Sequence, residues 1–314
     1  MNICLCALFL RPLPCPKNNN KSQEQSVLRS ASKNREKNMD RLKEVLAFVN
    51  NKGGVGKTTT VQNVAFGLLR RDSSLRVLCI DLDPQGNLST LLGWREKQKH
   101  YSNPLTVADV MRRGDDSRLP VYGFGGGLFY VPASSLLSDI EPDLHRQMQS
   151  KLVLSDLFGN GVRYMDSGSD VKEERIEESF DYILIDCAPA LSELTYNALG
   201  AATGVVIPVQ LGSLSVDGIG RMVEAYRNVR RRLNKELELR GLLIVMADER
   251  TNLSRETSDY LRNLYDDAVF RTRIRQCVKV GESQFHHQSI FEYAPSCTAA
   301  RDYEDFIEEL LETV

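Results

Sequence analysis

The stretch Asn50–Thr60, NNKGGVGKTTT, is a glycine-rich segment that carries two lysines, Lys52 and Lys57. It follows the apolar run EVLAFVN, which is typical of a buried strand, and runs into TTTVQNVAFGLLRR, which is typical of an amphipathic helix. A glycine-rich turn at the start of a helix presents backbone N–H groups and a positive dipole to phosphate. The stretch therefore predicts a phosphate-binding loop that needs one lysine, and the second lysine requires its own explanation.

The end of this stretch combines the groups that hold a magnesium nucleotide. In such a loop Lys57 bridges the β and γ phosphates, and Thr58 offers its hydroxyl group to Mg²⁺. The strict pattern GxxxxGK[ST] fails, because Asn51 stands where its first glycine would be, and KGGVGKTT is the deviant Walker A form. A tight turn without a ligand is the alternative interpretation. We expect ATP with Mg²⁺ to be bound by Lys52, Gly53, Gly54, Val55, Gly56, Lys57, Thr58 and Thr59.

Acidic residues at two strand ends extend the predicted site. The run ILIDCAP places Asp186 where a carboxylate holds a water of the Mg²⁺ shell. The run CIDLDPQGN places Asp81 and Asp83 two residues apart, so a strand points both side chains the same way. One carboxylate can then face the metal-bound waters while the other orients the attacking water; the alternative is that Asp83 only caps a turn. The predicted metal-site residues are Thr58, Asp81 and Asp186.

Short apolar runs and longer amphipathic segments alternate from Glu44 to the end of the chain. Strands of consecutive Val, Ile and Leu residues, separated by helices, are typical of a parallel sheet that is covered on both faces. The sequence predicts an α/β fold with a single doubly wound, mostly parallel sheet, in one domain over residues 43–314. The region 94–176 shows one strand and one helix, near His145–Phe158. Further strands are expected at 75–83, 128–134, 181–189, 204–210, 239–248 and 268–274, and further helices at 215–235 and 253–267.

Composition narrows the function classes. The 314 residues include 40 basic and 42 acidic ones and carry a formal charge of −2, so binding to a polyanion has to come from local clusters of charge. Seven cysteines occur without a CxxC pair or metal-ligand spacing, which favours a reducing cytoplasm. No stretch is long and apolar enough to predict a transmembrane helix.

The N-terminal residues 1–42 differ from the rest of the chain. The apolar run within MNICLCALFLRPLPCP has no basic segment before it and is too short to span a bilayer, so it makes a poor signal peptide. The polar segment that follows contains few apolar residues and is expected to be flexible. Because Met39 opens MDRLKEVLAFVN directly ahead of the first strand, we expect a disordered extension or a misannotated start.

The motifs KGGVGKTTT, DLDPQGNLS, FDYILIDCAPALSELTYNAL, VVIPVQ, ERTNLS and SIFEY occur in this order. Together they resemble the ParA/Soj partition ATPases of the wider ParA/MinD family of deviant Walker A P-loop ATPases, over nearly all of residues 45–310. The resemblance implies ATP hydrolysis that segregates plasmid or chromosomal DNA, weak alone and activated by a centromere-binding, ParB-like partner, in a cytoplasmic, nucleoid-associated protein. The alternative is a related positioning ATPase for another cargo, such as a carboxysome, a chemoreceptor array or a division-site regulator.

The resemblance also implies roles for the two predicted catalytic residues, Lys52 and Asp83. In the family, the residue that matches Lys52 crosses an ATP-dependent homodimer to contact the partner's phosphates, and the residue that matches Asp83 positions the hydrolytic water. Lys52 would crowd the phosphates that Lys57 already holds, yet it can reach the open triphosphate of a facing subunit. Hydrolysis then releases the dimer. A solvated loop charge is the alternative for Lys52.

The same resemblance implies that the ATP-bound dimer binds nonspecific DNA. Basic residues gather on the expected helix at 215–235 and at alternate positions of the expected strand at 268–274. Alternation would place Arg271, Arg273 and Arg275 on one face, where they can contact phosphate groups; solvated surface charge is the alternative. The predicted DNA-binding residues are Arg230, Arg231, Arg271 and Arg273, with Arg227, Arg232, Lys235 and Arg275 as neighbours.

Rival functions find less support. A membrane-bound relative would need a basic amphipathic C-terminal helix, whereas AARDYEDFIEELLETV has an acidic polar face that anionic lipid repels, so no membrane binding is expected. A nitrogenase-reductase-like role needs cluster-ligating cysteines that Cys187 alone does not provide. A non-hydrolysing scaffold would require loss of Lys57 or Asp83. The chain also departs from the family at Ile274–Cys277, where ParA-like proteins usually carry a Pro-Arg-Asn step beside the adenine.

Overall fold

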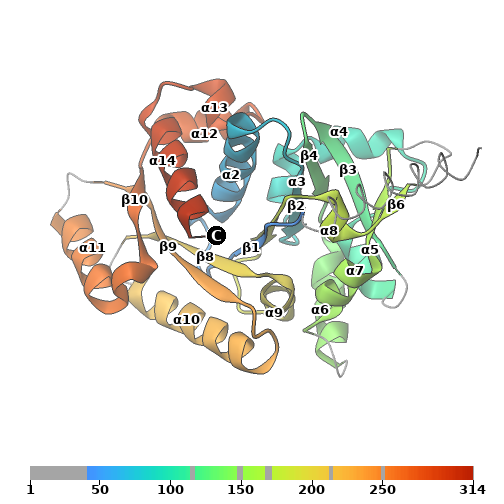
Figure 1. Cartoon of the computed structure of the whole chain (residues 1–314), viewed down its shortest axis with the longest axis horizontal. Helices are drawn as coiled ribbons and strands as arrows, with labels where there is room; N and C mark the ends of the chain where they lie inside the picture. Colours follow the sequence, from blue (N-terminus) through green and yellow to red (C-terminus); the bar gives the residue numbers. More distant parts are fainter. Residues whose placement is uncertain are drawn as a thin grey trace, which may run out of the picture. The chain divides into compact units, whose positions relative to one another are not determined.

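The computed structural model of the chain describes residues 41–113, 117–146, 151–166, 172–211, 215–248 and 252–313 (Figure 1). The expected N-terminal extension, residues 1–42, lies outside the described residues except for its last two positions. No helix within the described ranges has both the length and the apolar character needed to cross a membrane.

Ten strands of the described chain form one sheet. They are β1 (Glu44–Phe48), β2 (Val77–Leu82), β3 (Leu119–Gly125), β4 (Leu128–Val131), β5 (Val162–Tyr164), β6 (Glu173–Glu174), β7 (Tyr182–Cys187), β8 (Gly204–Gln210), β9 (Glu238–Ala247) and β10 (Val269–Arg275). Their order in the sheet is β10-β9-β8-β1-β7-β2-β4-β3-β5-β6, and neighbours are parallel except at β3–β4 and β5–β6. The predicted α/β fold with a mostly parallel sheet is confirmed.

Helices cover both faces of this sheet (Figure 1). They are α2 (Lys57–Arg71), α3 (Asn87–Leu91), α4 (Trp94–Lys97), α5 (Val107–Arg113), α6 (Leu136–Arg146), α7 (Val153–Asn160), α8 (Ile176–Ser179), α9 (Glu193–Ala201), α10 (Ser215–Arg232), α11 (Asn252–Tyr265), α12 (Val278–Phe285), α13 (Ile290–Tyr293) and α14 (Thr298–Glu312), with short 3₁₀ turns η1 (Gln98–His100) and η2 (Asp266–Ala268). Helices α2, α13 and α14 pack on one face with Phe48 and Leu184. Helices α7, α9 and α10 pack on the other with Ala47 and Ile185. The central strands are therefore buried on both sides.

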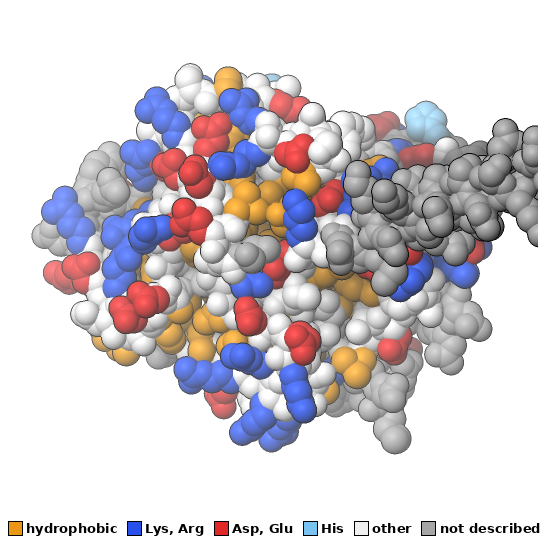
Figure 2. All heavy atoms as spheres, in the orientation of Figure 1, with side chains coloured by type: hydrophobic (Ala, Val, Ile, Leu, Met, Phe, Trp, Pro, Cys, Tyr) orange, Lys and Arg blue, Asp and Glu red, His pale blue; other side chains and the backbone are white. Residues whose placement is uncertain are grey.

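Acidic side chains of α14 cover the edge strand β10, and Figure 2 shows red and blue side chains interleaved there. Glu309 accepts hydrogen bonds from the backbone N–H groups of Arg271 (2.7 Å) and Thr272 (2.8 Å). Asp302 accepts one from the N–H group of Arg275 (2.9 Å). The same two carboxylates pair with the guanidinium groups of Arg271 (3.3 Å) and Arg275 (2.5 Å). These contacts occupy backbone N–H groups that would otherwise be free to pair with a strand of another chain.

The region 94–176 contains more structure than expected. The strands β3, β5 and β6 were not predicted, and the single helix expected near His145–Phe158 is wrong, because α6 ends at Arg146 and α7 begins at Val153. The N–H group of Leu154, in the first turn of α7, donates to Oδ1 of Asn197 on α9 (3.0 Å). A partner this far away in the sequence fixes the start of α7, so the local pattern could not reveal the break.

Replacing Glu309 by alanine tests the cover of the edge strand. The variant leaves two backbone N–H groups of β10 without their acceptor, and we expect the free energy of unfolding to fall by about 1–3 kcal/mol. Glu308→Ala is the matched control, because the Glu308 side chain is 65% exposed and lies 3.6 Å from Arg71, and exposed pairs contribute about 0–1 kcal/mol. Urea denaturation measures both variants, and equal losses would contradict the role of Glu309.

Candidate functional site

The predicted phosphate loop connects β1 to α2 and is held by Asn50, which the sequence analysis did not single out. Oδ1 of Asn50 accepts a hydrogen bond from the N–H group of Lys52 (2.9 Å), and its Nδ2 donates to the carbonyl oxygen of Pro208 on β8 (2.7 Å). Gly54 and Gly56 have φ angles of 73° and 74°, in the left-handed region that costs other residues about 1–2 kcal/mol. The loop is therefore a turn that its glycines allow and that Asn50 anchors to the sheet.

The ammonium group of Lys57 lies inside this turn. Its Nζ atom donates to the carbonyl oxygens of Asn50 (3.1 Å) and Lys52 (3.2 Å), and the residue is 6% exposed. Burial lowers the pKa of Lys57, and the nearby carboxylate of Asp186 opposes that shift. A lysine held in this way brings positive charge to the loop, which is the position that its predicted role requires.

Thr58 contacts Asp186 at the end of β7. The Thr58 hydroxyl group donates to Oδ2 of Asp186 at 2.7 Å, whereas the buried Oδ1 has no hydrogen-bond partner among the described residues. Burial raises the pKa of Asp186 well above its usual range, and the charge of Asp81 adds to the shift. In the described ranges, no group of three or more His, Cys, Asp or Glu side chains could hold a metal ion. The hydroxyl group and the orphaned carboxylate oxygen fit a hydrated Mg²⁺ ion that also takes oxygens from a bound phosphate.

Asp81 and Asp83, the two carboxylates expected on one face of the second strand, have different surroundings in the structure. Asp81 is fully buried: Oδ1 accepts from the N–H group of Asp83 (3.1 Å), and Oδ2 accepts from the N–H (2.8 Å) and hydroxyl (2.7 Å) groups of Ser89. Burial raises the pKa of Asp81 to about 6, and the bonds from Ser89 oppose the shift. Asp81 therefore links β2 to α3. Both oxygens accept hydrogen bonds from the protein, and the predicted metal role of Asp81 stays a prediction.

Asp83 follows the end of β2 at Leu82 and lines the cleft beside the phosphate loop. Its Oδ1 atom accepts a hydrogen bond from the N–H group of Gln85 (2.9 Å), and the residue is 7% exposed. Asp83 thus caps the turn with one carboxylate oxygen and also lines the cleft beside the loop. Capping the turn does not exclude a position in the cleft.

A cleft of about 520 Å³ opens on this side of the loop. It is lined by the predicted loop residues from Gly53 to Thr59 and by Asp83. Gln284 of α12 also lines it and donates from Nε2 to Oγ1 of Thr59 (2.7 Å). No local motif marks Gln284, because it reaches the loop only through the packing of the C-terminal helices. The sequence analysis missed Gln284 together with Asn87, Arg95, Met246 and His287.

A second cleft, of about 390 Å³, adjoins the first and shares Gly56, Thr59, Met246 and Gln284 with it. Its wall includes Ile274–Cys277, the segment in which the chain departs from the Pro-Arg-Asn pattern. The departure therefore lies beside the start of α2, within reach of whatever occupies the phosphate loop.

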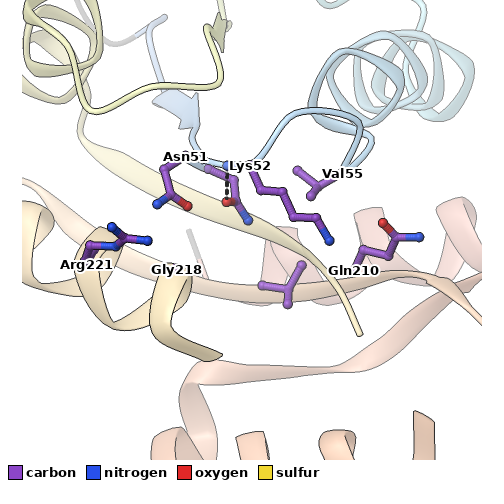
Figure 3. Close-up of a pocket in the computed structure, with 8 residues that line it drawn as sticks. Asn51, Lys52, Val55, Gln210, Gly218 and Arg221 are labelled. Carbon is purple, nitrogen blue, oxygen red and sulfur yellow. Dashed lines mark hydrogen bonds between the residues drawn. The ribbon is translucent and has the colours of Figure 1, made fainter. Parts of the chain in front are cut away.

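Lys52 lies in a separate cleft of about 320 Å³ on another side of the loop (Figure 3). Its side chain extends towards Gln210, and Asn51 lies between the loop and Arg221 of α10 (Figure 3). Lys52 is exposed and is not among the residues that line the cleft of Lys57. The side chains of Lys52 and Lys57 thus lie on different sides of the same loop.

Two of the predicted DNA-binding residues lie at the end of α10 and are exposed. Arg230 donates to the hydroxyl group of Tyr226 (3.2 Å), and Arg231 donates to Oδ1 of Asn228 (3.2 Å). Both partners are neutral, so these contacts leave the positive charge of the helix end uncompensated. Figure 2 shows Lys and Arg side chains gathered at the lower edge of the view, where Figure 1 has α10.

The other two, Arg271 and Arg273, lie on the edge strand β10 beside the acidic helix α14. Arg271 pairs with Glu309 (3.3 Å) and Glu312 (3.0 Å) of α14, and Arg273 is half-buried. The pairing of β10 with β9 shifts register on both sides of Arg273, which interrupts the simple alternation. The acidic residues of α14 therefore neutralise charge that the sequence pattern alone offered to DNA.

A glycine-rich turn between a parallel strand and a helix, with a buried lysine and a carboxylate at the next strand end, defines a P-loop NTPase. A family model described as an AAA domain matches residues 43–239. The chain is 33% identical over 273 residues to the chromosome-partitioning ATPase Soj of Treponema pallidum, covering 85% of this chain and 97% of that protein. It is 32% identical over 270 residues to the chromosome partitioning protein ParA of Caulobacter vibrioides, covering 85% and 93%. The chain belongs to the ParA/Soj-type P-loop ATPases.

A solved structure agrees with the P-loop NTPase fold. Cobyrinic acid a,c-diamide synthase from Mycobacterium smegmatis, solved with a bound ATP analogue and magnesium, matches with a TM-score of 0.66 and 28% identity, covering 86% of this chain and 95% of that one. The family resemblance inferred from the motifs is confirmed by the sequence relatives, and the P-loop NTPase fold by this structure.

The adjacent glycines of the loop provide a test of its conformation. Gly54→Ala meets open space but has to adopt a φ of 73°, so we expect it to lower the free energy of unfolding by about 1–2 kcal/mol. In Gly53→Ala the added Cβ would lie 3.8 Å from Cβ of Pro189, an ordinary contact without positive φ, and the change should stay within about 0.5 kcal/mol. Chemical denaturation of the two variants compares them directly, and a neutral Gly54→Ala would rule out this turn.

Proposed function

We propose that the chain binds ATP with Mg²⁺ beside the phosphate loop, forms a homodimer around the nucleotide, binds nonspecific DNA and hydrolyses ATP to segregate plasmid or chromosomal DNA. The observation that carries the proposal is the contact of Thr58 with the half-satisfied Asp186, next to the buried ammonium group of Lys57. The names of the Treponema and Caulobacter relatives support partition as the process. A centromere-binding, ParB-like activator belongs to the same proposal.

The cleft suits a triphosphate. Backbone N–H groups of the loop and the start of α2 favour anions, and Lys57 adds a full positive charge. When bound, Mg²⁺ supplies charge neutralisation and polarises the terminal phosphoryl group. Thr58 and Asp186 would hold it, Thr58 by its hydroxyl oxygen and Asp186 through a water. The adjoining cleft beside Ile274–Cys277 then takes the nucleobase, because it is continuous with the loop at Gly56.

Asp83 is the residue that we assign to the attacking water. Its carboxylate lies in the same cleft as Thr58, and the bond from Gln85 fixes its orientation. A carboxylate held in this way accepts a hydrogen bond from water and aligns it with the terminal phosphate, a positioning effect that dominates phosphoryl transfer.

Lys52 supports the ATP-dependent dimer. Its exposed side chain lies in the cleft that Arg221 also lines, whereas Lys57 lines the other cleft of the loop. A triphosphate bound to a second copy of the chain would lie close to both Lys52 and Arg221. It would compensate their positive charge only while the nucleotide is intact. The exposed Arg230 and Arg231 lie further along the same helix, so a dimer would carry two such basic ends and bind DNA more tightly than a monomer.

Replacing Asp83 by asparagine separates binding from hydrolysis. The amide oxygen can still accept the N–H group of Gln85, but the negative charge is lost, so ATP turnover should fall by about 10²–10⁴-fold. Binding of a fluorescent ATP analogue should change by less than about threefold. Asp72→Asn is the matched control, since Asp72 caps the N–H group of Ser74 at the same 2.9 Å but lies at the opposite end of α2. Normal turnover in Asp83→Asn would remove Asp83 from the mechanism.

Replacing Lys52 by alanine tests the shared nucleotide. The variant should still bind nucleotide but sediment as a monomer with ATP, and its ATP-dependent affinity for DNA should fall with the dimer. In the unmodified chain, the logarithm of DNA affinity should decrease linearly with the logarithm of salt concentration, with a slope of about −0.9 for each phosphate contacted. Lys43→Ala is the control, because Lys43 is exposed ahead of β1, at the end away from the loop. A normal ATP dimer of Lys52→Ala would exclude the cross-subunit role.

A further inference from the structure

Two half-buried thiols, Cys277 and Cys297, lie together where α12 and α14 begin. Each side chain is within hydrogen-bonding reach of the other. Both residues are the N-caps of their helices, and both helices lie on the same side of the sheet as α2 (Figure 1). The packing of α12 against α14 therefore brings together two thiols that are 20 positions apart in the sequence.

The surroundings make the two thiols unequal. Burial would raise the pKa of Cys277, but hydrogen bonds from the N–H group of Lys279, the Thr298 side chain and the N–H group of Ala299 outweigh it and lower the pKa. For Cys297, burial dominates and raises the pKa, although Sγ accepts from the N–H group of Ala300 (3.4 Å). A thiol that is more easily ionised beside one that stays protonated is the arrangement of an attacking and a resolving cysteine.

Cys277 is also reachable from the cleft that adjoins the phosphate loop. It lines that cleft together with Gln284, whose side chain donates to Thr59. By contrast, Cys79 and Cys187 are at most 1% exposed, and burial raises the pKa of both. Of the thiols in the described ranges, Cys277 is therefore the one that both lines a cleft and has a lowered pKa.

From this geometry we propose that Cys277 and Cys297 form a reversible oxidation site on the wall of the nucleotide cleft, with hydroperoxides as the oxidant. The Cys277 sulfur attacks the peroxide, the O–O bond breaks, and the thiol proton leaves with the departing oxygen as water or an alcohol. The resulting sulfenic acid is attacked by Cys297, the S–O bond breaks, and water carries away the Cys297 proton. Two thiols and one hydroperoxide thus give one disulfide, one alcohol or water, and one water.

The disulfide would tie the start of α12 to the start of α14. Gln284 belongs to α12, and Tyr303 of α14 lies 3.4 Å from Oγ1 of Thr60, so both tied helices contact the first turn of α2. Oxidation should therefore change nucleotide binding, and this consequence rests on the proposed function. The thiol chemistry itself does not depend on that function.

Peptide mapping of the full-length, reduced protein tests the thiol pair. After exposure to hydrogen peroxide, trypsin should release Gln276–Lys279 linked to Val280–Arg301, with two hydrogen atoms fewer than the separate peptides. Cys297→Ser should give no link and should accumulate a Cys277 sulfenic acid that dimedone traps. Cys277→Ser should give neither product. Absence of the linked peptide from the oxidised native protein would overturn the proposal.

Alkylation kinetics of the unmodified protein give a test that needs no variant. Mass spectrometry should show that iodoacetamide modifies Cys277 faster than Cys297, and equal rates would contradict the assignment. Binding of ADP with Mg²⁺ is first measured by calorimetry, which tests the proposed function separately. At about ten times the measured Kd, ADP should slow alkylation of Cys277 by about tenfold. Bound ADP that leaves the Cys277 rate unchanged would remove this site from the nucleotide cleft.

Discussion

The buried ammonium group of Lys57 is the constraint on which the site depends. Burying a charge is costly unless it is paired and hydrogen-bonded, and here the carbonyl oxygens of Asn50 and Lys52 accept its protons while Asp186 lies close enough to favour the charged form. The loop then completes its turn through Gly54 and Gly56, which adopt positive φ. The same turn directs the neighbouring N–H groups towards the cleft. One hydrogen-bonding arrangement thus sets the charge, the shape and the dipole of the phosphate loop.

Parts of this site follow from local sequence patterns, and other parts depend on tertiary packing. The loop and Asp186 could be predicted because a glycine-rich turn and an apolar strand with an acidic end are short, contiguous signals. For Asp81, the local pattern could not show that the distant Ser89 donates two hydrogen bonds to its carboxylate, and its place at the metal stays a prediction. Gln284 could not be found, because nothing in α12 itself indicates that it packs against Thr59. Its place results from the order in which the last three helices cover α2.

The acidic residues of helix α14 supported one inference from the sequence and have ion-pair partners in the structure that the sequence did not show. As a sequence, its polar face argued against membrane binding. In the structure its carboxylates pair with Arg70 and Arg71 of α2 and with Arg271 and Arg275 of β10. The helix therefore ties the element that starts at the phosphate loop to the edge of the sheet. It also pairs with two of the basic side chains on which a DNA surface on β10 would depend, whereas Arg230 and Arg231 at the end of α10 have neutral partners.

The substitution that makes the loop deviant also connects it to α10. Asn51 stands where the strict pattern has glycine, and a Cβ atom at Gly218 of α10 would lie only 3.0 Å from Oδ1 of Asn51. The close distance shows that the side chain of the loop lies directly against the backbone of the helix. Asn51 therefore packs against α10, which carries Arg221 in the Lys52 cleft and Arg230 at its exposed end. A glycine at position 51 would lack this contact. The asparagine that makes the loop deviant is thus also the side chain by which the loop contacts the basic helix.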